Sequence, residues 1–97
     1  MSPENSQSSM SEVELKPIIE ALIYLAEEPL TIESLIKILG KENEDSIRKL
    51  VKSLKEHYQK SDSGIEIKEV ADGFKMSTKP EYHDWVQKYI KHRKGTV

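Results

Sequence analysis

The spacing of apolar residues along the chain changes its period once, and this change predicts the order of the elements. From residue 13 to residue 26 apolar side chains recur at helical spacing, and Pro29 ends the run. The same spacing returns over 32–39 and over 47–58. Only from 65 to 78 does the period fall to two, as in a strand with one buried face. The pattern therefore predicts three helices followed by one β-hairpin.

Polar and glycine residues mark the ends of these elements. Thr31 and Asn43 are suitable N-caps for the second and third helices, because their side-chain oxygens can accept a hydrogen bond from the first helical turn. Gly40 is suited to end the second helix. The hairpin is expected to turn at Asp72-Gly73, since a type I′ turn needs positive φ at both central residues, which Gly adopts freely and Asp tolerates.

Helix, short turn, helix and hairpin in this order are typical of a winged helix-turn-helix domain. We expect a mainly α fold with a small β-hairpin, a strand stub at 29–31 and a C-terminal helix that begins at Lys79-Pro80. The predicted organisation is a disordered leader over 1–12, a winged-helix domain over 13–93, and a frayed tail or the start of a linker to a second domain over 94–97.

The predicted C-terminal helix carries an aromatic stripe on one face. Aromatic side chains of this kind are common both in cores and at interfaces. We expect most of the stripe to belong to the core and its edges to be available to a partner. The stripe consists of Tyr82, Trp85 and Tyr89, and Val86 and Ile90 share the same face.

Composition narrows the classes of function. The 97 residues carry a net charge of −2, which is not the strong positive field that non-specific nucleic-acid binding usually shows. The chain has no cysteine, so disulfides, thiolate nucleophiles and cysteine zinc sites are excluded. No apolar run approaches the roughly 18 residues that span a bilayer. A cytoplasmic globular domain fits these features best.

Candidate catalytic groups are sparse. The three histidines, His57, His83 and His92, occur singly. His83 and Asp84 are adjacent, but neighbours on a helix point about 100° apart and do not face each other. No phosphate-binding glycine loop or metal-ligand spacing is present. We therefore expect no enzyme activity, no cofactor and no metal, and interpret the histidines as solvated surface residues.

The third predicted helix occupies the position of a DNA-recognition helix. Arg48, Lys52 and Lys55 fall within about 60° of one another on its exposed side, where they could reach phosphates. Asp45 and Glu56 border this stripe, and side chains suited to reading base edges are nearly absent. An ordinary solvated helix face is the favoured interpretation, and a DNA-binding regulator is the alternative function.

The first predicted helix is apolar on more than one side, and Pro17, Ala21 and Tyr24 extend its apolar surface beyond one stripe. Two interpretations are open: the helix is central to a compact domain, or its outer side binds a partner. Our hypothesis for a self-association surface is Pro17, Ala21 and Tyr24, with Phe74 and Trp85 contributing from the wing and the last helix.

Two stretches also resemble a known family. Residues 17–35, PIIEALIYLAEEPLTIESL, resemble the "IEALLF…GEPL…L" opening of the bacterial segregation and condensation protein B (ScpB) family, although Glu27 stands where the family usually has Gly. Residues 73–82, GFKMSTKPEY, resemble its "GY.L.T.PEY" stretch. The resemblance covers about residues 15–93 in the right order.

The resemblance implies a non-catalytic subunit of the bacterial SMC condensin complex. Proteins of this family resemble two winged-helix domains in tandem, so this chain would correspond to the first. The family implies a homodimer that binds the kleisin ScpA and through it SMC, and acts in chromosome condensation, chromosome segregation and the cell cycle. It further implies a cytoplasmic location at the nucleoid, with no small-molecule substrate, no membrane and no direct nucleic-acid binding by this domain alone.

Overall fold

The computed structural model of the chain describes residues 11–40 and 43–95, which form five α-helical or 3-10 segments and three strands. In chain order the elements are α2 (Glu12–Leu25), β1 (Leu30–Thr31), α3 (Ile32–Leu39), α4 (Glu44–Lys60), β2 (Ile65–Val70), β3 (Gly73–Thr78), the 3-10 helix η1 (Pro80–Tyr82) and α5 (His83–Gly95). The strands form an antiparallel sheet in the order β1-β3-β2. The predicted winged helix-turn-helix fold is confirmed, including the strand stub before α3.

The helices begin where capping side chains meet their first turns. The Ser34 amide donates to Thr31 Oγ1 at 3.0 Å, and the Ser46 amide donates to Asn43 Oδ1 at 2.8 Å. Both predicted N-caps are confirmed. Gly40 ends α3 with a φ of 99°, in the range that glycine tolerates best.

The first helix has a start that the sequence reasoning missed. Ser11 and Glu14 form a capping box, in which each side chain accepts from the other residue's amide. Ser11 is therefore the N-cap and Glu12 the first residue of α2, whereas residues 1–10 of the predicted leader lie outside the described residues. At the other end α5 includes Lys94 and Gly95, and residues 96–97 of the predicted tail lie outside the described residues.

The hairpin turn is shifted by one residue from the prediction. Val70 pairs with Gly73, so the two loop residues are Ala71 and Asp72, and only Ala71 has a positive φ, of 56°. The predicted Asp72-Gly73 turn is therefore wrong. Gly73 is needed for a different reason: a Cβ there would lie 2.9 Å from the backbone carbonyl carbon of Pro29, because the chain entering β1 runs close beside Gly73.

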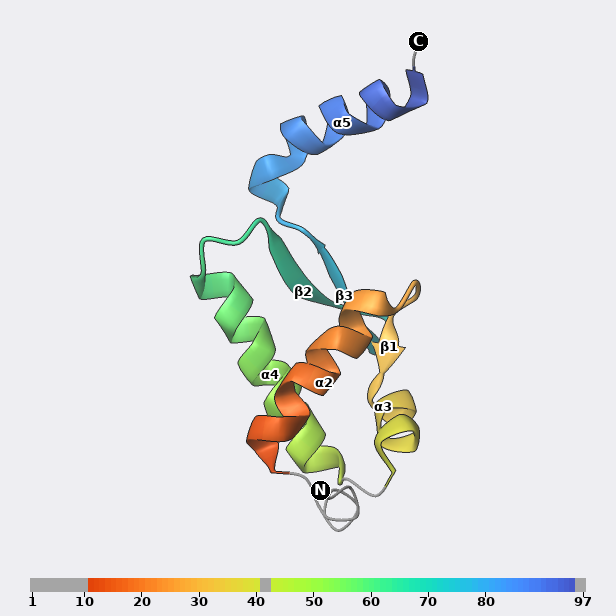
Figure 1. Cartoon of the computed structure of the whole chain (residues 1–97), viewed down its shortest axis with the longest axis vertical. Coiled ribbons are helices and arrows are strands. Elements are labelled where there is room, and N and C mark those ends of the chain that lie inside the picture. Colours follow the sequence, from red (N-terminus) through yellow and green to blue (C-terminus); the bar gives the residue numbers. More distant parts are fainter. Residues whose placement is uncertain (1–10, 41–42, 96–97) are drawn as a thin grey trace, which may run out of the picture.

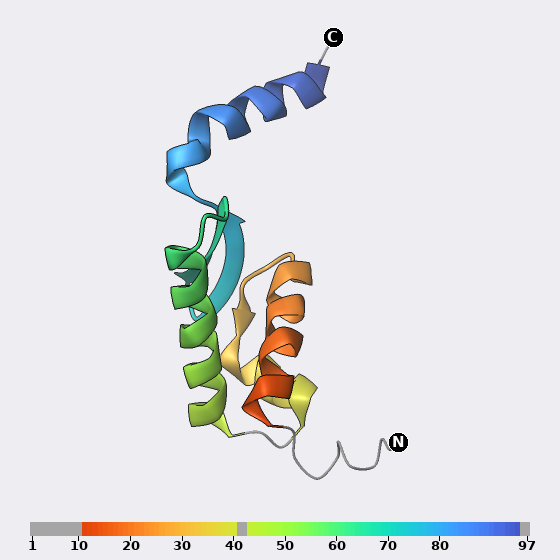
Figure 2. The same ribbon diagram turned by 60° about the vertical axis from the view of Figure 1, so that its left-hand side comes forward.

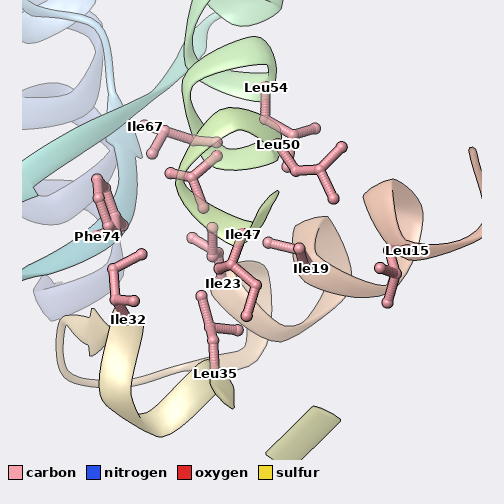
Figure 3. Packing of buried hydrophobic residues seen from close by; sticks show 11 residues of the cluster. Leu15, Ile19, Ile23, Ile32, Leu35, Ile47, Leu50, Leu54, Ile67 and Phe74 are labelled. Carbon is pink, nitrogen blue, oxygen red and sulfur yellow. The ribbon is translucent and has the colours of Figure 1, made fainter. Parts of the chain in front are cut away.

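The core lies between α2, α3, α4 and the inner face of the hairpin (Figure 3). On α2 it takes Leu15, Ile19 and Ile23 at a spacing of four, each at most 1% exposed. A fully buried side chain of this kind contributes about 1.5–3 kcal/mol. The remaining members are Ile32, Leu35, Ile47, Leu50, Val51, Leu54, Ile67 and Phe74.

The C-terminal helix stands apart from this core. Figures 1 and 2 show α5 extending away from the sheet end of the domain, which makes the molecule 53 Å long and about 28 Å across. Trp85 is 68% exposed and Tyr89 is 59% exposed. The expectation that most of the aromatic stripe is core is therefore wrong, because the chain leaves the domain after β3 and does not turn back. None of the described helices is long and apolar enough to cross a membrane.

Candidate interaction surfaces

The outer side of α2 borders a groove of about 360 Å³, here called the α2 groove. Pro17, Ala21 and Tyr24 are exposed along α2, and the ring of Tyr24 is 70% exposed. The opposite wall comes from α4 and from the ends of β2 and β3. The residues that line the groove are Pro17, Glu20, Ala21, Tyr24, Tyr58, Ile65 and Met76.

A hydrogen bond joins α2 to α4 within this groove. The Tyr58 hydroxyl donates to Glu20 Oε2, across 38 residues of sequence. The carboxylate acceptor, together with partial burial and the negative charge of Glu20, raises the pKa of Tyr58 from 10.0 to about 12. The protonated phenol links the two helices on that side of the groove.

The second apolar surface is the aromatic face of α5. Trp85 and Tyr89 are exposed along it, Tyr82 of η1 continues it toward the sheet, and Val86 and Ile90 are half-buried on the same face. Cationic side chains flank the rings: Lys88 Nζ lies 4.6 Å from the centre of the Trp85 ring, and the Arg93 guanidinium lies 5.9 Å from that of Tyr89. The face combines large aromatic anchors with a positive border.

The direction of α5 is set by Lys79. Its side chain is buried, at 8% exposed, and Nζ donates to the Ser61 carbonyl at 3.2 Å. The Lys79 amide donates to the Gly64 carbonyl at 2.8 Å, and the Tyr82 amide then donates to the Lys79 carbonyl at 3.0 Å. Two loop carbonyls thus hold the chain where it leaves the sheet.

The structure brings together only part of the surface that the sequence suggested. Pro17, Ala21 and Tyr24 share the α2 groove. Trp85 lies on α5, beyond the end of the domain (Figure 1). Phe74 is 6% exposed and packs in the core, so it does not present its ring to a partner as predicted.

The sequence reasoning missed the opposite wall of the groove, formed by Tyr58, Ile65 and Met76. One signal was available. Tyr58 ends the apolar stripe of α4 with a polar tip, and a half-buried Tyr usually directs its hydroxyl to a partner. No comparable signal distinguishes Ile65 and Met76 from ordinary inward residues of the hairpin.

Most of the cations in the basic stripe of α4 form ion pairs with acidic side chains. Arg48 Nε lies 2.8 Å from Glu44 Oε2, and Lys55 Nζ lies 3.7 Å from Glu69 Oε1 on the wing. Lys52 has no ion pair with any of the described side chains. Two of the three cations proposed for DNA contacts therefore already face a carboxylate, and the wing adds negative charge beside the helix.

Potential chemical sites among residues 11–40 and 43–95 are limited. In that part of the chain no group of three or more His, Asp and Glu side chains is placed to hold a metal ion. The ring of His57 contacts Tyr58 edge-on, with centres 5.3 Å apart, and His83 begins α5. The two histidines thus lie on separate elements.

Comparison with known proteins agrees with this architecture. Residues 17–96 match the family model of "Segregation and condensation complex subunit ScpB". The segregation and condensation protein B homolog of Coxiella burnetii is 37% identical over 82 residues, which are 81% of this chain and 38% of that protein. The chain therefore spans about two fifths of the length of this relative.

Solved structures show the same fold. ScpB from Mycobacterium tuberculosis matches with a TM-score of 0.77 and 22% identity, covering 84% of this chain and 51% of that one. A dimer of the ScpB N-terminal domain complexed with ScpA peptide matches with a TM-score of 0.71 and 23% identity, covering 78% of this chain and 94% of that one. On the family match and the sequence identity together, this chain belongs to the ScpB family of segregation and condensation complex subunits.

Proposed function

We propose that this chain is the N-terminal winged-helix domain of an ScpB-type subunit of the bacterial SMC condensin complex. In this role it forms a homodimer, binds the kleisin ScpA and through it SMC, and acts without catalysis in chromosome condensation and segregation. Its location would be the cytoplasm, at the nucleoid. The family match over residues 17–96 carries the proposal.

The exposed apolar surfaces support a role in protein association. Trp and Tyr are enriched at the centres of interfaces, where a few aromatic anchors supply most of the binding energy. Here Tyr24, Trp85 and Tyr89 are each more than half exposed in the single chain. The similar structure of an ScpB N-terminal dimer with ScpA peptide supports both a second copy and ScpA as partners.

Dimerisation is tested by the mass of the chain in solution. Sedimentation equilibrium is expected to give twice the mass of 11.2 kDa for the native chain. Tyr24→Arg should give a folded monomer, because it places a charge in an apolar contact while leaving the core intact. Ile38→Arg on α3 is the matched control, since Ile38 is also exposed but lies outside the α2 groove. A native chain that stays monomeric at every concentration would contradict the dimer.

Partner choice is tested by adding ScpA from the same genome. The expected result is a complex heavier than the dimer, and a mass that ScpA leaves unchanged would contradict the kleisin role. Duplex DNA serves as the competing ligand. Salt-dependent retention of the chain on DNA, abolished by Arg48→Glu with Lys52→Glu, would instead favour the regulator.

A further inference from the structure

We propose that α5 of one copy docks in the α2 groove of a second copy, and that the second copy returns the same contact. The inference rests on the proposed function, because it takes the homodimer as given and assigns the surfaces that form it. It makes α5 an exchanged element of the dimer, in addition to any role in leading the chain toward a second domain.

Each α5 is prevented from reaching its own groove. The chain is fixed at Lys79 by hydrogen bonds to Ser61 and Gly64. From there η1 continues into α5 without a break, since His83 has helical dihedral angles of −56° and −41° and its amide donates to the Pro80 carbonyl. Figures 1 and 2 show that α5 points away from α2. Folding it back would require breaking the helix or the Lys79 contacts.

The two surfaces suit the docking of an amphipathic helix in a groove. The helix offers its rings at positions 82, 85 and 89, three and four residues apart on one side. The groove offers the apolar side chains of Pro17, Tyr24 and Met76, and the small Ala21 leaves room for a ring between them. Both surfaces are exposed to solvent in the single chain.

The charges of the two surfaces also suit docking of α5 on α2. Lys88, Arg93 and Lys94 border or follow the aromatic face of α5, whereas Glu20 lies in the α2 groove and Glu27 follows the end of α2. Docking α5 on α2 places opposite charges side by side.

The exposed areas favour a reciprocal contact. A fully buried Trp or Tyr removes roughly 150–250 Å² from water, and Trp85, Tyr89 and Tyr82 can lose only the 68%, 59% and 38% that they expose. One docked α5 therefore falls short of the roughly 1,600 Å² of a standard interface. Reciprocal exchange doubles the buried area, so the native dimer should be tighter than a dimer held by one such contact.

The experiment uses Trp85, the single tryptophan of the chain, as a reporter. In the dimer its emission should lie at shorter wavelength and should move to longer wavelength on dilution, as the ring returns to water. Trp85→Ala with Tyr89→Ala should raise the dimer dissociation constant at least about tenfold. Tyr24→Arg should do the same, and should hold the Trp85 emission at the solvent-exposed wavelength.

Mixing the two variants separates exchange from other geometries. The Tyr24→Arg chain keeps its α5 and its Trp85, while the Trp85→Ala, Tyr89→Ala chain keeps its groove and has no tryptophan. Mixing should therefore restore one of the two contacts, raise the mean mass and move the Trp85 emission to shorter wavelength. The matched control adds a chain that carries all three substitutions, which should cause no shift. Circular dichroism checks that every variant is folded.

Each other outcome overturns the exchange in a distinguishable way. If the Trp85→Ala, Tyr89→Ala chain remains a native-like dimer, then α5 does not form the interface and the proposed function stands. If only Tyr24→Arg remains dimeric, two α5 helices pair with each other. If the Trp85 emission moves only when ScpA is added, these surfaces belong to the kleisin. A native chain that is always monomeric overturns both the exchange and the proposed dimer.

Discussion

The hydrogen bond from Tyr58 to Glu20 shows how one residue pair can couple α2 to α4. The neutral phenol is favoured in the folded chain, where its pKa rises from 10.0 to about 12. A raised folded pKa means that the contribution to stability is complete below pH 10 and is lost as the pH rises through about 12. Tyr58→Phe should lower the free energy of unfolding by about 1 kcal/mol at neutral pH.

Urea unfolding of the native chain and Tyr58→Phe at several pH values measures this effect. The stability gap between them should stay constant up to pH 10 and shrink as the pH approaches 12. Tyr24→Phe is the control, because the exposed Tyr24 ring lies outside the bond to Glu20. A gap that keeps its size at high pH would show that the Tyr58 hydroxyl does not contribute through Glu20.

The turn of the wing contains a second residue-scale prediction. Ala71 has a φ of 56°, a conformation that costs an L-residue roughly 1–2 kcal/mol. Ala71→Gly removes this cost but adds flexibility to the unfolded chain, so the free energy of unfolding should rise by about 0.5–1 kcal/mol. Thermal unfolding followed by circular dichroism measures the change, and a variant less stable than the native chain would contradict the assigned strain.

Gly73 provides the opposite test two residues further on. A Cβ at this position would approach the Pro29 carbonyl carbon to 2.9 Å, which forces β1 and β3 apart. Gly73→Ala should therefore lower the free energy of unfolding by about 1–3 kcal/mol. Ala71→Gly and Gly73→Ala together distinguish a turn at Ala71-Asp72 from a turn at Asp72-Gly73. In a turn at Asp72-Gly73 the strained residue would be Gly73, and Ala71→Gly would leave the free energy of unfolding nearly unchanged.

At the scale of elements, the sequence predicts what local chemistry decides. Thr31 and Asn43 begin α3 and α4 because a capping oxygen acts within three residues of sequence. The position of the hairpin turn depends on β1, which lies about 40 residues earlier and pairs with Gly73 through Thr31, so the Asp-Gly pair alone was misleading. Whether α5 packs on the core or stays at the surface also depends on distant residues. Its amphipathic stripe is equally consistent with a core helix and with an interface helix, and only the direction fixed at Lys79 separates them.

The same limit applies to the candidate site. Pro17, Ala21 and Tyr24 could be found because they widen the apolar arc of one helix. Phe74 was placed at the surface because alternation in a hairpin does not show which face is covered, whereas β1 and the helices bury it. Tyr58 was missed because its partner Glu20 lies 38 residues away.

The connection between the sheet and α5 gives an element-scale prediction. Lys79→Met keeps the apolar stem but removes the donor to the Ser61 carbonyl, so the start of η1 should loosen. We expect faster amide hydrogen exchange in 79–83 and weaker dimerisation, with protection of the α4 amides unchanged. Lys91→Met is the control, since Lys91 is exposed within α5. Unchanged exchange in 79–83 would show that Lys79 does not hold the direction of α5.

At the scale of the whole molecule, charge is divided between the two ends of the chain. Acidic groups are frequent on and after α2, whereas the last turn of α5 contains His92, Arg93 and Lys94. A net charge of −2 conceals this division. In a dimer with exchanged α5 helices the opposite charges are neighbours, while the apolar groove supplies most of the contact area. Such an interface should be weakened by salt without being abolished.

This arrangement predicts a measurable salt dependence of the dimer. Between about 0.1 M and about 1 M sodium chloride the Debye length falls from about 10 Å to about 3 Å, so attraction between α5 and the α2 groove is screened. The dissociation constant from sedimentation should rise severalfold. Arg93→Gln should reduce this rise, because Arg93 lies over Tyr89 on the aromatic face. Lys91→Gln removes the same charge from the opposite side of the helix and should leave the slope nearly unchanged. If both variants had equal slopes, the salt effect would reflect net charge alone, and the aromatic face of α5 would not lie against Glu20 in the α2 groove.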